Sequence, residues 1–212
     1  MTREKIRFDS SWDDAHPFDE ELADLLKKFN LPGTFYLPGN VGPEYPINAS
    51  LVKKLVDQGF EIGGHTVSHP QDLKQLSVEQ ILKEISDNKQ ALETLSGQKV
   101  TKFCYPRGRY DDRVIRILKG LGFTYARTTE VLRLTRENAF RTPTSIHVYQ
   151  RKEYGDHDWV EMANSMVELA TRSMGGVFHI WGHSWELTKF NNWEKLESFF
   201  AWLTENYEIV PV

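Results

Sequence analysis

Two histidines separated by three residues form the most informative short motif of the chain, His65-Thr66-Val67-Ser68-His69. Residues four positions apart lie on one side of a helical turn, so both imidazoles can reach a single metal ion. Alone, this spacing is more typical of two polar loop histidines. Gly63-Gly64 before the motif and Pro70 after it favour the metal site, because they predict a sharp turn off a strand. No Glu follows the first His, which excludes the H-E-x-x-H pattern of metalloproteases.

A second pair of histidines has the same spacing, His179-Ile180-Trp181-Gly182-His183. Residues four apart also share one face of a strand, so this pair is a rival metal site. His179 lies within the apolar run 177–181, which favours a hydrogen-bonded histidine in the core. His183 follows Gly182 at the expected end of a strand, from which an imidazole can reach a substrate.

Adjacent carboxylates follow the first expected strand at Asp13 and Asp14. One can ligate a metal while the other accepts a proton from the attacking water. The alternative is a pair of solvated acids that cap the next helix. Two imidazole nitrogens and one carboxylate oxygen leave an open coordination position, as catalytic metal sites require.

Strands and helices alternate along the chain, which predicts an α/β fold with mainly parallel strands. The expected strands cover residues 5–9, 34–37, 60–62, 100–105, 123–126, 145–149, 177–181 and 209–210, and the expected helices 17–29, 50–58, 77–96, 111–121, 158–171 and 192–205. Seven or eight strands are enough to close a barrel, whose catalytic residues follow the carboxyl ends of the strands. By that rule the acids, the histidines, Arg107 and Arg109 gather on one rim. Residues 38–46, rich in proline and glycine, are expected to form a loop.

Composition limits the classes of function. The 212 residues carry 26 basic and 30 acidic side chains, a net charge of −4, which disfavours nucleic-acid binding. A single cysteine excludes an intramolecular disulfide and a cysteine-rich metal site. No apolar run of about 18 residues is present, so no membrane span is expected. The polar N-terminus predicts a cytoplasmic protein without a signal peptide; an export signal trimmed from the chain is the alternative.

Over nearly its whole length the chain resembles the polysaccharide deacetylase family, carbohydrate esterase family 4, whose NodB-like domain is a single distorted (β/α)7-type barrel. The five ordered motifs of that family are matched by Ser11-Trp12-Asp13-Asp14, His65-Thr66-Val67-Ser68-His69, Phe103-Cys104-Tyr105-Pro106-Arg107-Gly108-Arg109-Tyr110, Asp156-His157-Asp158-Trp159 and Trp181-Gly182-His183. The resemblance implies that residues 1–212 form one catalytic domain.

The resemblance also implies a role for each matched residue. Asp13 is the general base and His183 the general acid. Asp14, His65 and His69 bind one divalent metal, with Zn²⁺ as the first expectation and Co²⁺, Mn²⁺ or Ni²⁺ as alternatives. The residues expected to contact substrate are Tyr105, Arg107, Arg109, Trp159 and Trp181.

Three positions depart from the family pattern. Cys104 stands where the family often has an Arg that orients the base, and Arg107 or Arg109 are the expected substitutes. Ala15 replaces the usual Gly. The acetyl pocket keeps Trp159 but has the larger Trp181 at a position that is usually Leu.

The resemblance implies a metal-dependent hydrolase that removes acetyl from an N- or O-acetylated carbohydrate. One alternative is hydrolysis of another linear or cyclic amide on the same scaffold. A second is a non-catalytic sugar-binding relative, which the complete set of acid, base and metal ligands disfavours. The expected partner is an acetylated sugar or another small amide, with no nucleic acid and no membrane. The oligomeric state is left open.

Overall fold

The computed structural model describes residues 3–39 and 47–212, and most of the loop expected over 38–46 lies outside this part. The strands are β1 (Glu4–Asp13), β2 (Thr34–Leu37), β3 (Glu61–Gly64), β4 (Lys102–Cys104), β5 (Tyr125–Arg127), β6 (Ile146–His147), β7 (Phe178–Gly182) and β8 (Tyr207–Pro211). All recorded pairings are parallel, in the order β5-β4-β3-β2-β1-β7-β6, and β8 pairs with the first half of β1.

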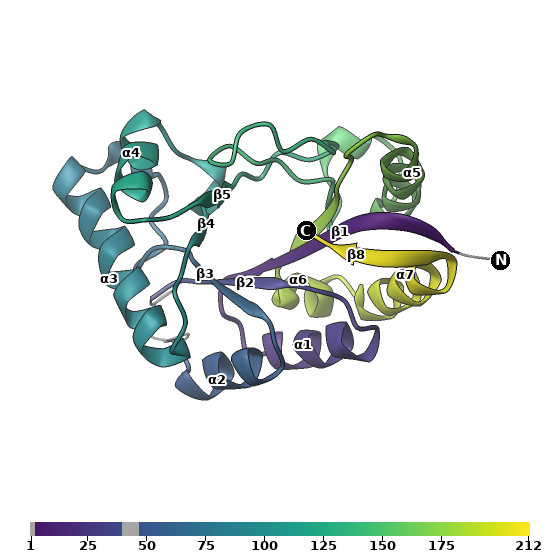
Figure 1. The fold of residues 1–212 in the computed structure, drawn as a ribbon, viewed down its shortest axis with the longest axis horizontal. Coiled ribbons are helices and arrows are strands. Elements are labelled where there is room, and N and C mark those ends of the chain that lie inside the picture. Colours follow the sequence, from purple (N-terminus) through teal and green to yellow (C-terminus); the bar gives the residue numbers. More distant parts are fainter. Residues whose placement is uncertain (1–2, 40–46) are drawn as a thin grey trace.

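Helices cover the outer face of this curved sheet (Figure 1). They are α1 (Asp19–Lys28), α2 (Ala49–Asp57), α3 (Val78–Ser96), α4 (Asp112–Gly120), α5 (Trp159–Arg172), α6 (Ser184–Lys189) and α7 (Trp193–Asn206), with short 3-10 turns η1 (Leu73–Gln75), η2 (Pro106–Gly108) and η3 (Lys152–Tyr154). Local sequence explains their limits: Ser77 and Gln80 form a capping box at the start of α3, and Gly97 ends it with φ 67°. The helix α6 was not expected from the sequence.

The sheet curls because its two outer edges are joined by the segment 139–147. The amide of Thr142 donates to the carbonyl of Ala126 in β5, and the amide of Thr128 donates to the carbonyl of Thr142. A few residues later, the amide of Ser145 donates to the carbonyl of His179 on β7. The expected α/β fold and distorted barrel are therefore confirmed.

Strand β1 runs through the centre of the fold and has two buried faces with different chemistry. Phe8 packs against Phe178, which in turn contacts Phe199 of α7 on the helical side. Asp9 and Asp13 alternate with these apolar residues and point into the barrel. The strand ends at Asp13, not at Asp9 as expected, so Asp13 is held by the sheet itself.

Candidate active site and metal centre

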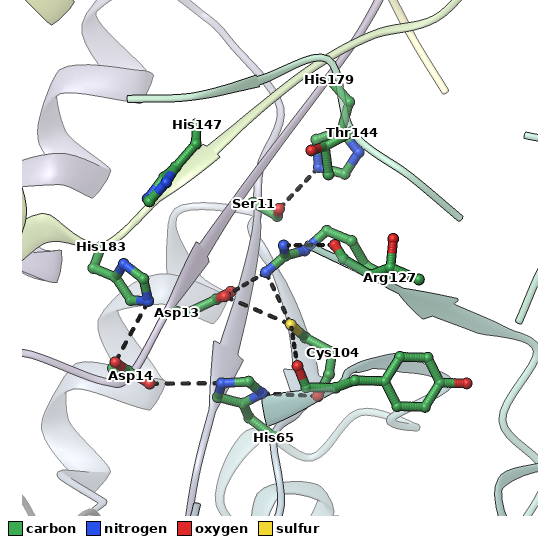
Figure 2. Close-up of polar contacts among 12 residues, drawn as sticks. Ser11, Asp13, Asp14, His65, Cys104, Arg127, Thr144, His147, His179 and His183 are labelled. Atoms are coloured by element: carbon green, nitrogen blue, oxygen red, sulfur yellow. Dashed lines mark hydrogen bonds and ion pairs between the residues drawn. The ribbon is translucent and has the colours of Figure 1, made fainter. Parts of the chain in front are cut away.

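The rim formed by the carboxyl ends of the strands carries the residues that the motifs singled out. Asp13 ends β1, His65 follows β3, and His183 follows β7. They line a cavity of about 210 Å³, whose walls are Asp13, Asp14, His65, His69, Tyr105, Arg107, Thr129, Trp181, His183 and Trp185. The barrel closure thus brings all five expected acids and histidines together (Figure 2 shows four of them).

Asp14, His65 and His69 form one cluster with the donor set of a catalytic metal site. Asp14 Oδ1 lies 3.5 Å from the Nε2 atom of His65 and 3.5 Å from that of His69. This oxygen is buried and has no hydrogen-bond partner among the described residues. Each of the three residues has a ligand atom within 4.8 Å of the others. Two imidazoles and one carboxylate with room for water fit a divalent cation such as Zn²⁺.

Asp14 and His69 have the charge states of metal ligands, whereas His65 would lose a proton on binding a cation. Burial opposes the charged ring of His65, but Cys104 and Asp14 raise its pKa well above the usual value. Burial and the charge of His65 lower the pKa of His69 to about 4, so its ring is neutral at neutral pH. Burial opposes ionisation of Asp14, but His65 and His183 hold its pKa well below the usual range. The Nδ1 atom of His65 lies 2.8 Å from the carbonyl oxygen of Cys104, which directs Nε2 toward Asp14.

The backbone of the motif adopts conformations that cost free energy in order to aim these rings. Thr66 and His69 have φ values of 69° and 49°, in the left-handed region, which costs of order 1–3 kcal/mol for each such residue. Glu84 of α3 holds the turn, because its carboxylate accepts hydrogen bonds from the amides of Val67 and Ser68 at 3.0 and 2.8 Å.

The flanking residues serve this turn differently from what the sequence suggested. The two glycines before the motif do not make the turn. They end β3, and a Cβ at Gly63 would lie 2.3 Å from the ring of Tyr36.

Ala15 stands where the family usually has glycine. Its φ of 55° lies in the left-handed region that favours glycine.

Asp13 is bound by an arginine that lies outside the five motifs. The guanidinium of Arg127, at the end of β5, donates to Asp13 Oδ2 and also lies 2.9 Å from Cys104 Sγ. Burial opposes ionisation, but Arg127 holds the pKa of Asp13 below its usual value. The expectation that Arg107 or Arg109 replaces the missing arginine is therefore wrong. Like the other site residues, Arg127 lies at the carboxyl end of a strand, at the rim of the barrel.

The other carboxylate oxygen of Asp13 is available for chemistry. Oδ1 is buried and has no hydrogen-bond partner within the described residues. Because Arg127 occupies Oδ2, the carboxylate is fixed with one lone-pair face toward the cavity. A fixed, ionised carboxylate with a free oxygen has the properties of a general base.

His183 faces the same cavity and is held by Glu186. Its Nδ1 lies 2.7 Å from Glu186 Oε2, and its Nε2 lies 3.5 Å from Asp14 Oδ2. Burial opposes the charged ring, but the hydrogen bond and charge of Glu186 and the charge of Asp14 raise the pKa of His183 to about 9. The imidazolium is thus the main form at neutral pH, as a general acid requires.

The rival metal pair is not a site. His179 is buried inside the barrel, where its Nε2 lies 2.8 Å from Ser11 Oγ and its Nδ1 lies 3.2 Å from Arg136 Nη2. Both ring nitrogens are therefore engaged by the protein. The prediction of a hydrogen-bonded core histidine is confirmed.

Of the expected substrate residues, Tyr105, Arg107 and Trp181 line the cavity. Tyr105 donates its hydroxyl to the carbonyl of Phe140, and its amide bonds to the carbonyl of Arg127, so its ring is what it offers to a ligand. Arg107 has neither an ion pair nor a hydrogen bond in the described part of the chain. Thr129 and Trp185, which no motif indicated, also line the walls.

Two expected substrate residues are elsewhere. Arg109 donates to the carbonyl of Gln71 outside the cavity. Trp159 is the first residue of α5 and is only 2% exposed, because its ring packs against Phe199 of α7.

The segment matched to the fourth motif therefore does not reach the cavity. Asp158 caps α5 and pairs with Lys195 at 2.7 Å, so this stretch is part of the α5–α7 interface. Its assignment to the acetyl pocket is wrong.

The sequence of the chain is similar to a known family and to curated proteins. A family model described as polysaccharide deacetylase matches residues 5–126. The chain is 29% identical over 126 residues to the peptidoglycan-N-acetylmuramic acid deacetylase PdaA of Bacillus subtilis, covering 58% of this chain and 46% of that protein. It spans less than half the length of the first curated relatives it matches.

Solved structures give the same fold. A family 4 carbohydrate esterase from Streptomyces lividans, in complex with acetate, aligns with a TM-score of 0.62 at 18% identity over 95% of this chain and 90% of that one. BA3943 from Bacillus anthracis, described as a CE4 family pseudoenzyme, aligns with a TM-score of 0.69 at 20% identity over 100% of this chain and 66% of that one. In the described residues, no helix combines the length and apolar character needed to cross a membrane.

Proposed function

The chain belongs to the polysaccharide deacetylase family, and we propose that it is a metal-dependent hydrolase that removes acetyl groups from N- or O-acetylated carbohydrate. The observation that carries the proposal is one cavity lined by a carboxylate–histidine–histidine cluster, a carboxylate held by Arg127 and a histidine held by Glu186. A non-catalytic sugar-binding protein has no need of both an acid and a base in the same cavity as a metal site. We propose further that residues 1–212 act as one catalytic domain.

Asp14, His65 and His69 would hold the metal, with Zn²⁺ as first choice and Co²⁺, Mn²⁺ and Ni²⁺ as alternatives. When bound, the cation supplies a Lewis acid beside the acetyl carbonyl and favours ionisation of the attacking water. Asp13 accepts the proton of that water through its free oxygen, while Arg127 keeps the carboxylate ionised and immobile.

The remaining groups stabilise charge and complete the reaction. The amide of Arg107 has no acceptor in the described part of the chain, and those of Tyr105, Gly108 and Arg109 are already bonded. It is therefore the backbone donor available to the developing oxyanion. His183 donates its Nε2 proton to the departing amine or alkoxide. The unpaired side chain of Arg107 would bind a polar or anionic group of the substrate.

The test is metal analysis of the purified chain combined with acetate release from a panel of acetylated mono- and oligosaccharides. We expect one equivalent of metal and release that stops with chelator and returns with Zn²⁺. D14N should lose both metal and activity, whereas D57N, a matched change at an exposed helical carboxylate, should lose neither. Release from simple or cyclic amides but from no carbohydrate would support the alternative amide hydrolase. Metal binding without any hydrolysis would support the non-catalytic alternative.

A further inference from the structure

We infer that His147 is a positioning residue for the general acid: through the carboxylate of Glu186, it holds the His183 ring in the direction from which it donates its proton. The inference rests on the proposed hydrolase function and extends it to a residue that none of the family-like motifs contains. His147 is one of two residues in the short strand β6, and it is 5% exposed.

The connection is a single oxygen shared by two histidines. Glu186 Oε2 lies 2.7 Å from Nδ1 of His183 and 2.8 Å from Nε2 of His147. The backbone amide of His183 donates to the same oxygen at 3.3 Å. A carboxylate oxygen that accepts from three directions is fixed in orientation, and each donor restricts where the others lie.

The protonation of His147 follows from its surroundings. Its Nδ1 atom is buried and has no hydrogen-bond partner among the described residues, so the single proton of the neutral ring is on Nε2 and points to Glu186. Burial lowers the pKa of His147, which keeps the ring neutral at pH 7. His147 therefore orients the Glu186 carboxylate as a neutral donor, so that His183 is the only charged histidine paired with that carboxylate among the described residues.

The ring of His147 is stacked on one face, and its backbone is anchored by a tyrosine. It stacks on Trp181 with centroids 4.0 Å apart and an interplanar angle of 8°. The hydroxyl of Tyr154 accepts from the amide of His147 and donates to its carbonyl, at 2.8 and 3.2 Å. Such a ring has one orientation available, which is what a positioning group needs.

The indole of Trp181 also contacts the arginine that orients Asp13, the proposed general base. The guanidinium carbon of Arg127 lies 4.5 Å from the centroid of the Trp181 ring. Arg127 orients Asp13, and His147 orients Glu186 and hence His183 (Figure 2 shows Arg127 and His147 with the residues of the rim). The positioning groups of the base and the acid thus rest on one side chain that lines the cavity.

Three variants separate this role from simple packing. H147F keeps a flat ring against Trp181 and removes the donor, whereas H147Q replaces the ring with a side chain that carries an amide donor. F190L serves as a control for a change of an aromatic residue outside the cavity and the network. Each variant of the 212-residue chain, loaded with Zn²⁺, is assayed on an N-acetylated chitooligosaccharide and on 4-nitrophenyl acetate, whose leaving group departs without protonation. Metal content and thermal unfolding are recorded in parallel.

We expect H147F to lower kcat for the amide by roughly 10- to 100-fold, the usual cost of a misdirected catalytic group, with KM, metal content and hydrolysis of 4-nitrophenyl acetate little changed. H147Q should recover part of the loss, and F190L should resemble the wild type. An equal loss on both substrates, or H147Q as impaired as H147F, would overturn the inference in favour of a packing role.

A second readout keeps the inference testable if the wild type releases no acetate, which would refute only the proposed function. The Nδ1 proton of His183, hydrogen-bonded to a carboxylate, should give a far-downfield proton NMR signal, which would be assigned by its loss in H183Q. We expect this signal to move upfield in H147F and to return toward its wild-type position in H147Q. A signal that is unchanged in H147F would contradict the inference regardless of activity.

Discussion

The interior of the barrel contains two clusters, each of which combines an aspartate of β1, a histidine in or directly after β7, and an arginine. The floor cluster consists of Asp9 and Ser11 of β1, His179 of β7 and Arg136. The rim cluster consists of Asp13 of β1, His183 after β7 and Arg127 of β5, with Asp14 between them. Each cluster pairs an aspartate with an arginine and places a histidine nearby.

The two clusters differ in how completely their polar atoms are paired. In the floor cluster, Asp9 Oδ2 pairs with Arg136 at 2.6 Å, and both nitrogens of His179 have partners. In the rim cluster, one carboxylate oxygen of Asp13 and one of Asp14 have no partner among the described residues, and both residues line the cavity. Reactivity therefore depends on unpaired lone pairs that a ligand can reach.

Neighbouring charge separates the two histidines further. Burial and the cations Arg136 and Arg127 lower the pKa of His179 well below the usual value, so its ring is neutral. His183 is also buried, but Glu186 and Asp14 raise its pKa to about 9. The sign of the nearest charges, not the depth of burial, decides which histidine carries a proton for catalysis.

The largest expected effect comes from exchanging the aspartates of the two clusters for asparagine. D13N should lower kcat by roughly 10²–10⁴, the contribution of a positioned general base, with metal content retained. D9N should retain kcat and lose about 1–3 kcal/mol of stability, because it leaves Arg136 without its anion. Acetate release per folded molecule and urea unfolding measure the two effects. A D9N protein that is as inactive as D13N would remove the distinction between the clusters.

Replacing the arginine of each cluster should lower the free energy of unfolding by different amounts. R127L leaves Asp13 as an uncompensated buried charge and should cost about 3–5 kcal/mol of unfolding free energy. R136L should cost less, because the Arg136 and Asp9 side chains are 19% and 10% exposed and water can solvate the acid. The double variant R127L/D13N should regain stability without activity. Equal destabilisation by R127L and R136L in urea unfolding would contradict this ranking.

A third buried acid, without a cation, sharpens the comparison. Asp19 is fully buried, accepts from Ser184 Oγ at 2.6 Å and has a second oxygen without a partner among the described residues. Burial, opposed by the Ser184 hydrogen bond and reinforced by the charge of Asp14, raises its pKa to about 8.

Asp19 should therefore make stability depend on pH. Stability from the protonated carboxyl is fully present below its ordinary pKa of 3.8 and is lost as the pH rises through about 8. D19N cannot ionise, so from pH 4 to pH 9 it should gain at least about 1.4 kcal/mol relative to the wild type, the equivalent of one pKa unit. Thermal and urea unfolding at several pH values measure the difference. A difference that does not change with pH would show that Asp19 keeps an ordinary pKa.

The smallest effect is expected for the unpaired arginine of the rim. R107A should raise KM several-fold, a loss of about 1 kcal/mol, with stability unchanged because Arg107 has no partner to lose. R109A is the matched control outside the cavity and should leave KM unchanged. Steady-state kinetics on one acetylated substrate test both variants. A larger effect from R109A would place the substrate on the other side of η2.

The sequence alone was enough to predict the fold class and the grouping of Asp14, His65 and His69. The His65–His69 spacing is local, and the rule that site residues follow the ends of parallel strands needs only the order of elements. That rule brought Asp13, Asp14 and His183 to the same rim, as the structure shows. The rule applies equally to Arg127, which directly follows the strand expected over 123–126, but Arg127 belongs to none of the five motifs.

Other parts of the site depended on tertiary structure. Arg127 and Asp13 are 114 residues apart on strands that are not neighbours in the sheet, and only the closure of the barrel makes them meet. Trp159 follows a motif-like acid, but the docking of α5 on α7 turns its ring into the core. Local sequence determines which side chains are available and how they are spaced along an element. Which of them face a shared cavity, and which charges neighbour them there, depends on how distant elements pack together.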